Sequence, residues 1–206
     1  MKVLLINGSP HEKGCTYTAL SFIAGELKAQ GIETEILHVG GQPVGGCIGC
    51  GGCRSGNGCV FGGVVNEAIE KAKTADAFVF GSPVHYASAA GNMASFMDRL
   101  AYAGGKYLAY KPAAICCSAR RAGTTSTLDQ LVKYPQFFHM PLVNGSYWAM
   151  VHGSNPEQVL QDAEGCAVMQ ELGRNMAWLL RCIEAGKAAG IDHPQNPPRP
   201  MTSFIR

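Results

Sequence analysis

The stretch KVLLINGSP, residues 2–10, decides the fold class. Its first part, Lys2–Asn7, is a short apolar run with β-branched side chains, which is typical of a buried strand. The Gly-Ser-Pro that follows ends the strand and begins a loop. The same order recurs where DAFVF, Asp76–Phe80, is followed by a second Gly-Ser-Pro. The chain therefore contains two buried strands that each lead into a loop.

Working outward, apolar residues at helical spacing predict helices between the strands. The predicted helices are Thr16–Gln30, a segment marked by Val64, Val65, Ala68, Ile69 and Ala72, Ala90–Tyr102, Thr124–Phe138 broken by Pro135, and Cys166–Ala185. The other predicted strands are Ile32–Val39, Lys111–Ser118 and one within Leu142–His152. Strands that alternate with helices predict an α/β fold with a parallel sheet and helices on both faces. Five strands favour a flavodoxin-like three-layer sandwich of strand order 2-1-3-4-5.

Length and composition favour one globular domain with a large buried core. The chain has 206 residues, of which 47% are hydrophobic and 16% are charged. We expect the domain to span residues 1–189. A C-terminal tail, residues 190–206, should follow, since its prolines at positions 194, 197, 198 and 200 exclude a helix.

Charge and cysteine content limit the partners and the compartment. The formal net charge is +2, which favours neither nucleic acid nor a membrane surface as a partner. No segment offers the about 20 apolar residues that a membrane span needs, and the N-terminal apolar run is too short for a secretion signal. Nine cysteines in such a chain indicate a reducing compartment rather than a disulfide framework. We expect a cytoplasmic protein.

Ligands of open α/β sheets bind beyond the carboxyl ends of the strands, where the strand order reverses. The candidate loops are residues 8–18, 81–88 and 118–124. The first leads into a helix N-terminus, whose free N–H groups attract anions, and it carries several hydroxyl side chains. This suits a phosphate monoester, although the hydroxyls would also suit plain helix capping. In the second loop Pro83 and the pair His85-Tyr86 would suit a planar ring or an ordinary strand-to-helix connection.

Three segments together carry a family resemblance: LLINGSP, FGSPVHYASAAGNMASFMDRL and CCSARRAGT. They resemble the NADPH-dependent FMN reductase family of the flavodoxin-like superfamily. The resemblance implies bound FMN and NAD(P)H as cosubstrate. The cofactor-binding residues that it implies are Ser9, Cys15, Thr16, Tyr17 and Thr18 in the phosphate loop, Pro83, Val84, His85 and Tyr86 beside the ring, and Ser118 and Arg120 at the far edge of the ring.

Four cysteines lie close together in a glycine-rich loop, residues 45–63. Cys47, Cys50, Cys53 and Cys59 form C-x2-C-x2-C-x5-C, and four thiolates at this spacing suit a [4Fe–4S] cluster or a zinc ion. A loop that holds no metal is the third interpretation. The pattern resembles that of the iron-sulfur flavoprotein group, which implies electron transfer between a cluster and FMN.

The expected function is that of an FMN-dependent oxidoreductase, which takes hydride from NAD(P)H and reduces a quinone, a flavin or another small acceptor. We predict no catalytic side chain, because the cofactor carries the redox chemistry. The alternatives are an electron carrier that uses FMN and a [4Fe–4S] cluster, and a zinc-stabilised binding module without turnover. The expected partners are a small-molecule acceptor or a redox protein, and further copies of the chain in a homodimer or homotetramer.

Overall fold

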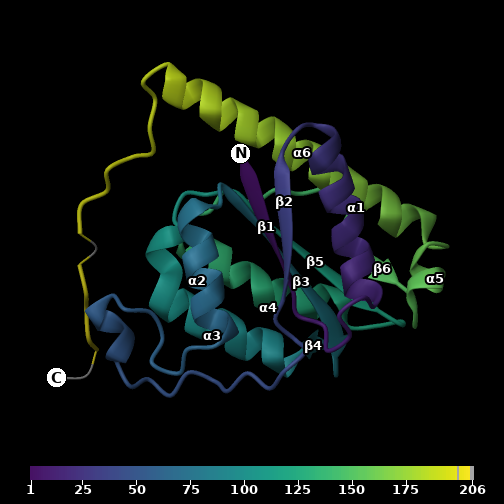
Figure 1. Ribbon diagram of the computed structural model, residues 1–206, viewed down its shortest axis with the longest axis horizontal. Coiled ribbons are helices and arrows are strands. Elements are labelled where there is room, and N and C mark those ends of the chain that lie inside the picture. Colours follow the sequence, from purple (N-terminus) through teal and green to yellow (C-terminus); the bar gives the residue numbers. More distant parts are fainter. Residues whose placement is uncertain (199, 205–206) are drawn as a thin grey trace.

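The computed structural model describes residues 1–198 and 200–204 (Figure 1). The strands are β1 (Lys2–Asn7), β2 (Glu33–His38), β3 (Ala77–His85), β4 (Ser88–Ala89), β5 (Ala113–Ala119) and β6 (Met150–His152). The α-helices are α1 (Cys15–Ala29), α2 (Val64–Thr74), α3 (Gly91–Gly104), α4 (Thr124–Phe137), α5 (Pro156–Val159) and α6 (Ala163–Ala188). Two 3-10 helices, η1 (Gly52–Ser55) and η2 (Gly105–Tyr107), complete the elements.

The sheet has the order β2-β1-β3-β5-β6, and these strands are parallel. Counted along the parallel strands alone, this is the predicted order 2-1-3-4-5, so the flavodoxin-like fold is confirmed. The short β4 is an addition that the sequence did not reveal, and it pairs antiparallel with the end of β3.

The helices cover both faces of the sheet (Figure 1). Along β1, Val3 and Leu5 pack into the core that lies under α1 and α6. Leu4 and Ile6 pack into the opposite core, under α2, α3 and α4. Because successive side chains of a strand point to opposite faces, an uninterrupted apolar run buries β1 on both sides and produces three layers.

Two predicted elements need correction. Pro135 does not break α4, which continues to Phe137. The proline lies in the last turn, where its missing N–H costs one hydrogen bond at the fraying end. The predicted strand Asp76–Phe80 extends through Gly-Ser-Pro to His85. Pro83 is tolerated there because the pairing of β3 with β1 has already ended at Gly81, although Pro83 still lies opposite Ser118 of β5.

The end of β3 and β4 form a hairpin around Tyr86 and Ala87. Both residues have positive φ, 49° and 57°, which is the conformation of a type I′ turn. The Gln130 side chain on α4 holds β4: its Oε1 atom accepts from Ser88 Oγ at 2.6 Å and from Ala89 N at 2.8 Å. Tertiary contacts therefore stabilise a turn that lacks the usual glycine or asparagine.

The segment after α6 contacts the domain at Tyr110. The His193 ring stacks on the Tyr110 ring at 4.4 Å, and Asn196 Nδ2 donates to the Tyr110 hydroxyl at 2.6 Å. In Figure 1 this yellow segment descends along one side of the molecule. The division into a domain, 1–189, and a tail, 190–206, stays a prediction. Among the described helices none is both long and apolar enough to cross a bilayer.

Candidate functional site

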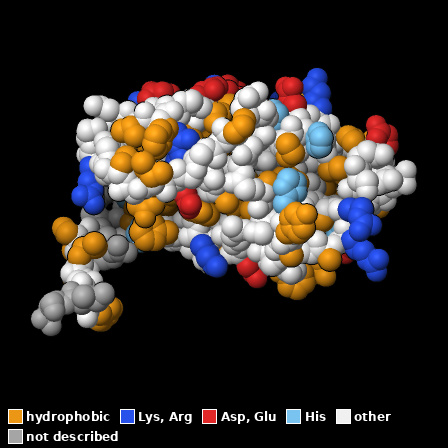
Figure 2. Space-filling view, turned by 90° about the horizontal axis from the view of Figure 1, so that it is seen from below, with side chains coloured by type: hydrophobic (Ala, Val, Ile, Leu, Met, Phe, Trp, Pro, Cys, Tyr) orange, Lys and Arg blue, Asp and Glu red, His pale blue; other side chains and the backbone are white. Residues whose placement is uncertain are grey.

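The parallel strands bring the three predicted loops to one edge of the sheet. In the register, Asn7 at the end of β1 lies opposite Gly81, and Pro83 lies opposite Ser118. Figure 2 looks onto this edge, where acidic and basic side chains are scattered rather than gathered in one large patch. A ligand at this edge would therefore be held by specific hydrogen bonds rather than by a broad charged surface.

The buried side chain of Asn7 organises the first loop. Its Nδ2 donates to the Glu12 carbonyl at 2.9 Å, and its Oδ1 accepts from Ser9 N at 3.1 Å. Ser9 is buried, and its hydroxyl accepts from His11 N at 3.1 Å. His38 Nε2 donates to the Ser9 carbonyl at 2.7 Å. The loop is thus held by hydrogen bonds from its own side chains and from His38 on β2.

The start of α1 presents the free N–H groups expected of an anion site. Thr18 N donates to the Gly14 carbonyl at 3.0 Å, which is the first bond of the helix. The N–H groups of Cys15, Thr16 and Tyr17 therefore point out of the helix end. Gly40 adjoins this loop so closely that a Cβ atom there would overlap the Ser9 carbonyl and lie 2.6 Å from the Gly8 carbonyl oxygen.

The hydroxyl groups of Thr16 and Ser118 connect the first and third loops. They share a hydrogen bond of 2.8 Å, and both residues are buried. The Thr16 methyl group packs toward Gly81, where an added Cβ would lie 3.0 Å away. Thr16 and Ser118 are therefore brought together beneath the edge. Their contact with a cofactor stays a prediction, for which the Thr16 main-chain N–H is better placed than its hydroxyl.

The second and third loops also lie against each other. A Cβ atom on Gly123, whose φ is +92°, would lie 2.6 Å from the Ala87 Cα and 2.9 Å from Val84 Cγ1. Tyr86 is fully exposed at the tip of the hairpin, while His85 and Arg120 are also exposed. These three exposed side chains therefore border the edge where the loops meet.

The four clustered cysteines line a single pocket of about 300 Å³. Cys47 and Cys50 are exposed, whereas Cys53 and Cys59 are half-buried. Phe61, Tyr102 and other side chains of α3 and the loop form the remaining wall. Among the described residues, no three His, Cys, Asp or Glu side chains stand in a metal-coordinating arrangement. The four cysteines therefore line the same pocket, but their sulfur atoms do not lie close enough together to coordinate one metal ion.

Arg99 on α3 is the buried charge behind this pocket. Its Nε donates to Cys59 Sγ at 3.3 Å, its Nη1 to the Gly45 carbonyl at 3.4 Å and its Nη2 to the Gly62 carbonyl at 3.0 Å. Its side chain also lies over the Phe61 ring, with Cζ 5.6 Å from the ring centroid. One guanidinium group thus binds both ends of the cysteine loop and one cysteine.

Two asparagines fix the same loop. Asn66 on α2 pairs with the Cys59 main chain, accepting from its N at 2.8 Å and donating to its O at 3.0 Å. Asn92, near the start of α3, binds Val44 N and the carbonyls of Gly40 and Gln42. Since α3 begins beside the sheet edge and reaches Arg99 roughly 12 Å further on, one helix connects the edge that carries the three loops with the cysteine pocket.

Three of the five cysteines outside this loop lie in packed surroundings. Cys116 and Cys117 are buried in β5, and burial raises the pKa of both thiols, that of Cys117 to about 12. Cys15 Sγ donates to the Gly153 carbonyl at 3.5 Å, and partial burial raises its pKa. A raised pKa disfavours the thiolate, which is the reactive form of cysteine.

Five residues that hold the loops and β4 in place were not predicted from the sequence: Asn7, His38, Asn92, Arg99 and Gln130. Asn92 and Arg99 lie within the segment FGSPVHYASAAGNMASFMDRL, one of the three that carry the family resemblance, and this was the signal that could have identified them. Their partners lie about 40 or more residues away in the chain, which no local pattern reveals.

Relatives of similar length carry the name iron-sulfur flavoprotein. One from Methanocaldococcus jannaschii is 27% identical over 192 residues, which is 89% of this chain and all of the relative. One from Methanosarcina thermophila is 24% identical over 193 residues, which is 91% of this chain and 99% of the relative. A third, from Archaeoglobus fulgidus, is 36% identical over 99 residues, 48% of each chain.

Solved structures show the same fold at low sequence identity. The RosB protein with bound 8-demethyl-8-formylriboflavin-5′-phosphate has a TM-score of 0.72 at 14% identity, covering all of this chain and 96% of that one. An NADH:FMN oxidoreductase has a TM-score of 0.61 at 18% identity, covering 88% and 89%. An archaeal flavodoxin has a TM-score of 0.60 at 13% identity, covering 88% and 99%.

A family model described as NADPH-dependent FMN reductase agrees with these relatives, with the solved structures and with the resemblance in the sequence. It matches residues 1–155, which include the three edge loops and the cysteine loop. The chain belongs to the NADPH-dependent FMN reductase family, and its relatives include the iron-sulfur flavoprotein group.

Proposed function

We propose that this protein is an FMN-dependent oxidoreductase that holds a [4Fe–4S] cluster on Cys47, Cys50, Cys53 and Cys59 and transfers electrons between the two cofactors. The observation that carries the proposal is the gathering of these four cysteines in one pocket, backed by a buried arginine. The relatives named iron-sulfur flavoprotein support it across about nine-tenths of the chain.

The edge loops fit FMN. The free N–H groups of Cys15, Thr16 and Tyr17 suit its phosphate, because a helix N-terminus attracts an anion. Because Gly40 has no Cβ atom, the Ser9 carbonyl can lie against it without a steric clash. The half-buried Pro83 and Val84 offer an apolar wall for a ring, with His85, Tyr86, Ser118 and Arg120 around it.

The cysteine loop fits an iron-sulfur cluster by its donor set. Four soft thiolates are the usual ligands of such clusters, and glycines with positive φ at positions 49, 51, 56 and 58 let the chain wrap tightly. A cluster held by these thiolates would carry negative charge, and the Arg99 guanidinium, which donates to Cys59 Sγ, would offset part of it.

Bound FMN exchanges electrons singly or in pairs, and a cluster exchanges them singly. The protein's own residues bind, orient and shield these groups. Asn7 and His38 hold the phosphate loop, and Arg99 and Asn66 hold the cysteine loop. The proposed acceptor is a small molecule or a redox protein.

Anaerobic purification followed by absorption spectroscopy and metal analysis tests the proposal. We expect a flavin spectrum and about four irons per chain. Cys50→Ser should lose the iron and keep the flavin. Cys182→Ser, an exposed cysteine outside the pocket, is the matched control and should keep both. Stoichiometric zinc without iron would establish the zinc-stabilised alternative, and failure to bind FMN on reconstitution would refute the whole proposal.

A second candidate is direct oxidation of NAD(P)H at the flavin, which the family match to NADPH-dependent FMN reductases favours. Anaerobic mixing with NADH or NADPH tests it, since bleaching of the flavin band by either nucleotide shows hydride transfer. We also propose a cytoplasmic location, because an odd number of cysteines, nine, fits a reducing compartment better than a disulfide framework, and assembly as a homodimer or homotetramer.

A further inference from the structure

The sheet has a gap beside β5. Ala113 N donates to the Pro141 carbonyl at 2.9 Å, and Val143 N donates to the Ala113 carbonyl at 2.8 Å. Regular pairing resumes only at Cys117, whose N donates to the Ala149 carbonyl at 3.0 Å and which pairs with Met150. Between these points, residues 144–148 leave the sheet.

Because residues 144–148 leave the sheet, the main chain of Ile115 has no hydrogen-bonding partner on the β6 side of β5 within the described part of the chain. In a parallel strand every second residue directs its N–H and C=O toward the same neighbour, so Ile115 faces the gap as Ala113 and Cys117 do. Among the hydrogen bonds of the described residues, none joins the Ile115 main chain to the departing segment. An inward-facing N–H and C=O pair of this kind needs a hydrogen-bonding partner.

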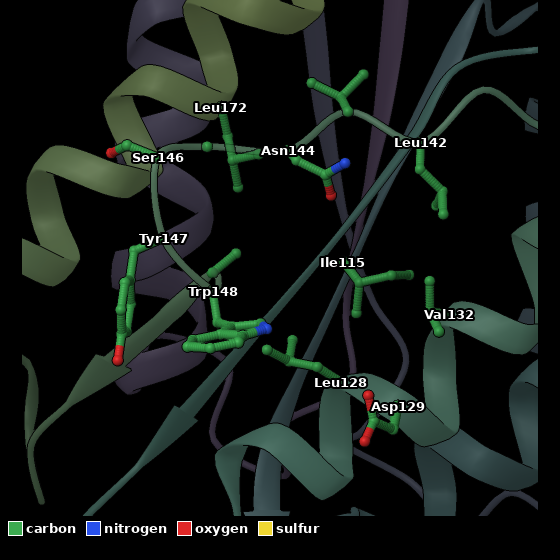
Figure 3. A pocket seen from close by; sticks show the side chains of 13 residues that line it. Ile115, Leu128, Asp129, Val132, Leu142, Asn144, Ser146, Tyr147, Trp148 and Leu172 are labelled. Atoms are coloured by element: carbon green, nitrogen blue, oxygen red, sulfur yellow. The ribbon is translucent and has the colours of Figure 1, made fainter.

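A cavity of about 520 Å³ lies in the gap, within the usual range for small-molecule sites of about 300–1,000 Å³. Its walls are largely aliphatic, with Leu128 and Val132 of α4 and Leu142 on the departing segment. Figure 3 shows the Trp148 indole lying across one side and the Asn144 amide pointing into the cavity. Its lining residues include none of the predicted FMN or cysteine ligands.

The chemistry of these walls defines the ligand. An N–H beside a C=O on one strand complements a carboxamide, which presents an acceptor beside a donor. The aliphatic walls and the Trp148 ring suit a flat aromatic body. Asp129 also lines the cavity and its carboxylate disfavours an anion.

We propose that this cavity binds a planar, uncharged aromatic carboxamide or cyclic lactam. Its C=O accepts from Ile115 N–H, its N–H donates to the Ile115 carbonyl, and its ring packs on Trp148. The site is independent of the proposed redox function, because neither the edge loops nor the cysteine pocket contributes to it.

The two tryptophans of the chain make the test direct. Trp148 lines the cavity, while Trp178 is exposed on α6 and outside it. The FMN-saturated protein, labelled with ¹⁵N, is titrated with 1-naphthamide, and the two indole N–H signals are followed. The signals are assigned with Trp178→Ala. We expect the Trp148 signal to shift and saturate while the Trp178 signal stays.

Chemical and protein variants separate the proposed contacts. N,N-dimethyl-1-naphthamide, which lacks the donor, should bind about tenfold more weakly, and so should 1-naphthoate, which is an anion. By calorimetry, Trp148→Ala should weaken binding of 1-naphthamide about tenfold, and the matched Trp178→Ala should not. Equal binding of the three probes, or no Trp148 shift, would overturn the proposal. A Trp148 shift that follows protein concentration without probe would also overturn it, since a second copy would then cover the cavity.

Discussion

The Nε atom of Arg99 lies 3.3 Å from the Sγ atom of Cys59, and the same guanidinium binds the carbonyls of Gly45 and Gly62 on either side of the cysteine loop. Arg99 is 6% exposed, so its charge is shielded from water. A buried cation must be satisfied by hydrogen bonds, and here the cysteine loop supplies them. The loop and Arg99 therefore stabilise each other.

Replacing Arg99 should disorganise the loop. In Arg99→Met two carbonyls and one sulfur lose their donor, and the half-buried Gly62 carbonyl, left unpaired, costs about 1–3 kcal/mol. We expect less iron per chain and faster proteolysis within residues 45–62. Arg99→Lys should recover only part of the protection, because an ammonium group cannot reproduce the guanidinium fork.

Arg54→Met is the matched control, since Arg54 lines the same pocket but is exposed. Metal analysis and limited proteolysis of the metal-free protein measure the two effects separately. If Arg99→Met and Arg54→Met hold equal iron and are cleaved at equal rates, Arg99 does not support the loop.

Gly40→Ala should weaken FMN binding by displacing the phosphate loop. The added Cβ would overlap the Ser9 main chain, and neither neighbour is a flexible side chain that can move aside. We expect at least about a tenfold loss of FMN affinity and about 1–3 kcal/mol lower stability. Fluorescence titration of the metal-free, flavin-free protein with FMN measures the affinity.

Gly25→Ala serves as the comparison for this change. Gly25 is exposed within α1, and a Cβ there would meet nothing within 4 Å. The Gly25→Ala variant should be about 0.5–1 kcal/mol more stable than the natural sequence, with unchanged FMN affinity. Equal FMN affinities in the two variants would contradict the steric role of Gly40.

The Thr16–Ser118 hydrogen bond should appear as a coupling between the two positions. Thr16→Val or Ser118→Ala alone leaves a buried hydroxyl unpaired, which costs about 1–3 kcal/mol. The double variant should cost less than the sum of the singles, with a coupling of about 0.5–3 kcal/mol. Urea unfolding of the four flavin-free proteins gives this value, and strict additivity would show that the bond does not form.

Glu35 on β2 should make stability depend on pH. Lys71 Nζ lies 2.6 Å from its carboxylate and Lys2 Nζ 2.9 Å, and these ammonium groups, Lys71 foremost, lower the pKa of Glu35. A lowered folded-state pKa gives stability that is present above the unfolded value of about 4.3 and lost as pH falls through the folded value.

Glu35→Gln should therefore be about 0.5–1 kcal/mol less stable than the natural sequence at pH 7. The difference should shrink below about pH 4.3. Urea unfolding at a series of pH values measures it. A difference that stays constant through this range would mean that packing, rather than the carboxylate charge, explains the effect.

The fold was predictable because its determinants are local. Lys2–Asn7 and the apolar part of β3 are uninterrupted apolar runs, and helical periodicity fills the intervals between strands. The hairpin at Tyr86 and Ala87 escaped prediction because neither residue favours positive φ. Gln130, 41 residues from Ala89 in the sequence, holds β4 in place through a tertiary hydrogen bond.

The sequence by itself determined the parallel sheet, the three loops at one edge and the grouping of four cysteines, since each follows from apolar runs, turn residues or close spacing along the chain. The tertiary structure alone decided that Arg99 faces Cys59, that the Thr16 hydroxyl forms a hydrogen bond with the Ser118 hydroxyl, and that Ile115 faces a cavity. Each of these depends on which distant segments the packed sheet and helices bring within hydrogen-bonding distance. Local sequence patterns predict helices and strands, but they do not predict which distant segments come into contact.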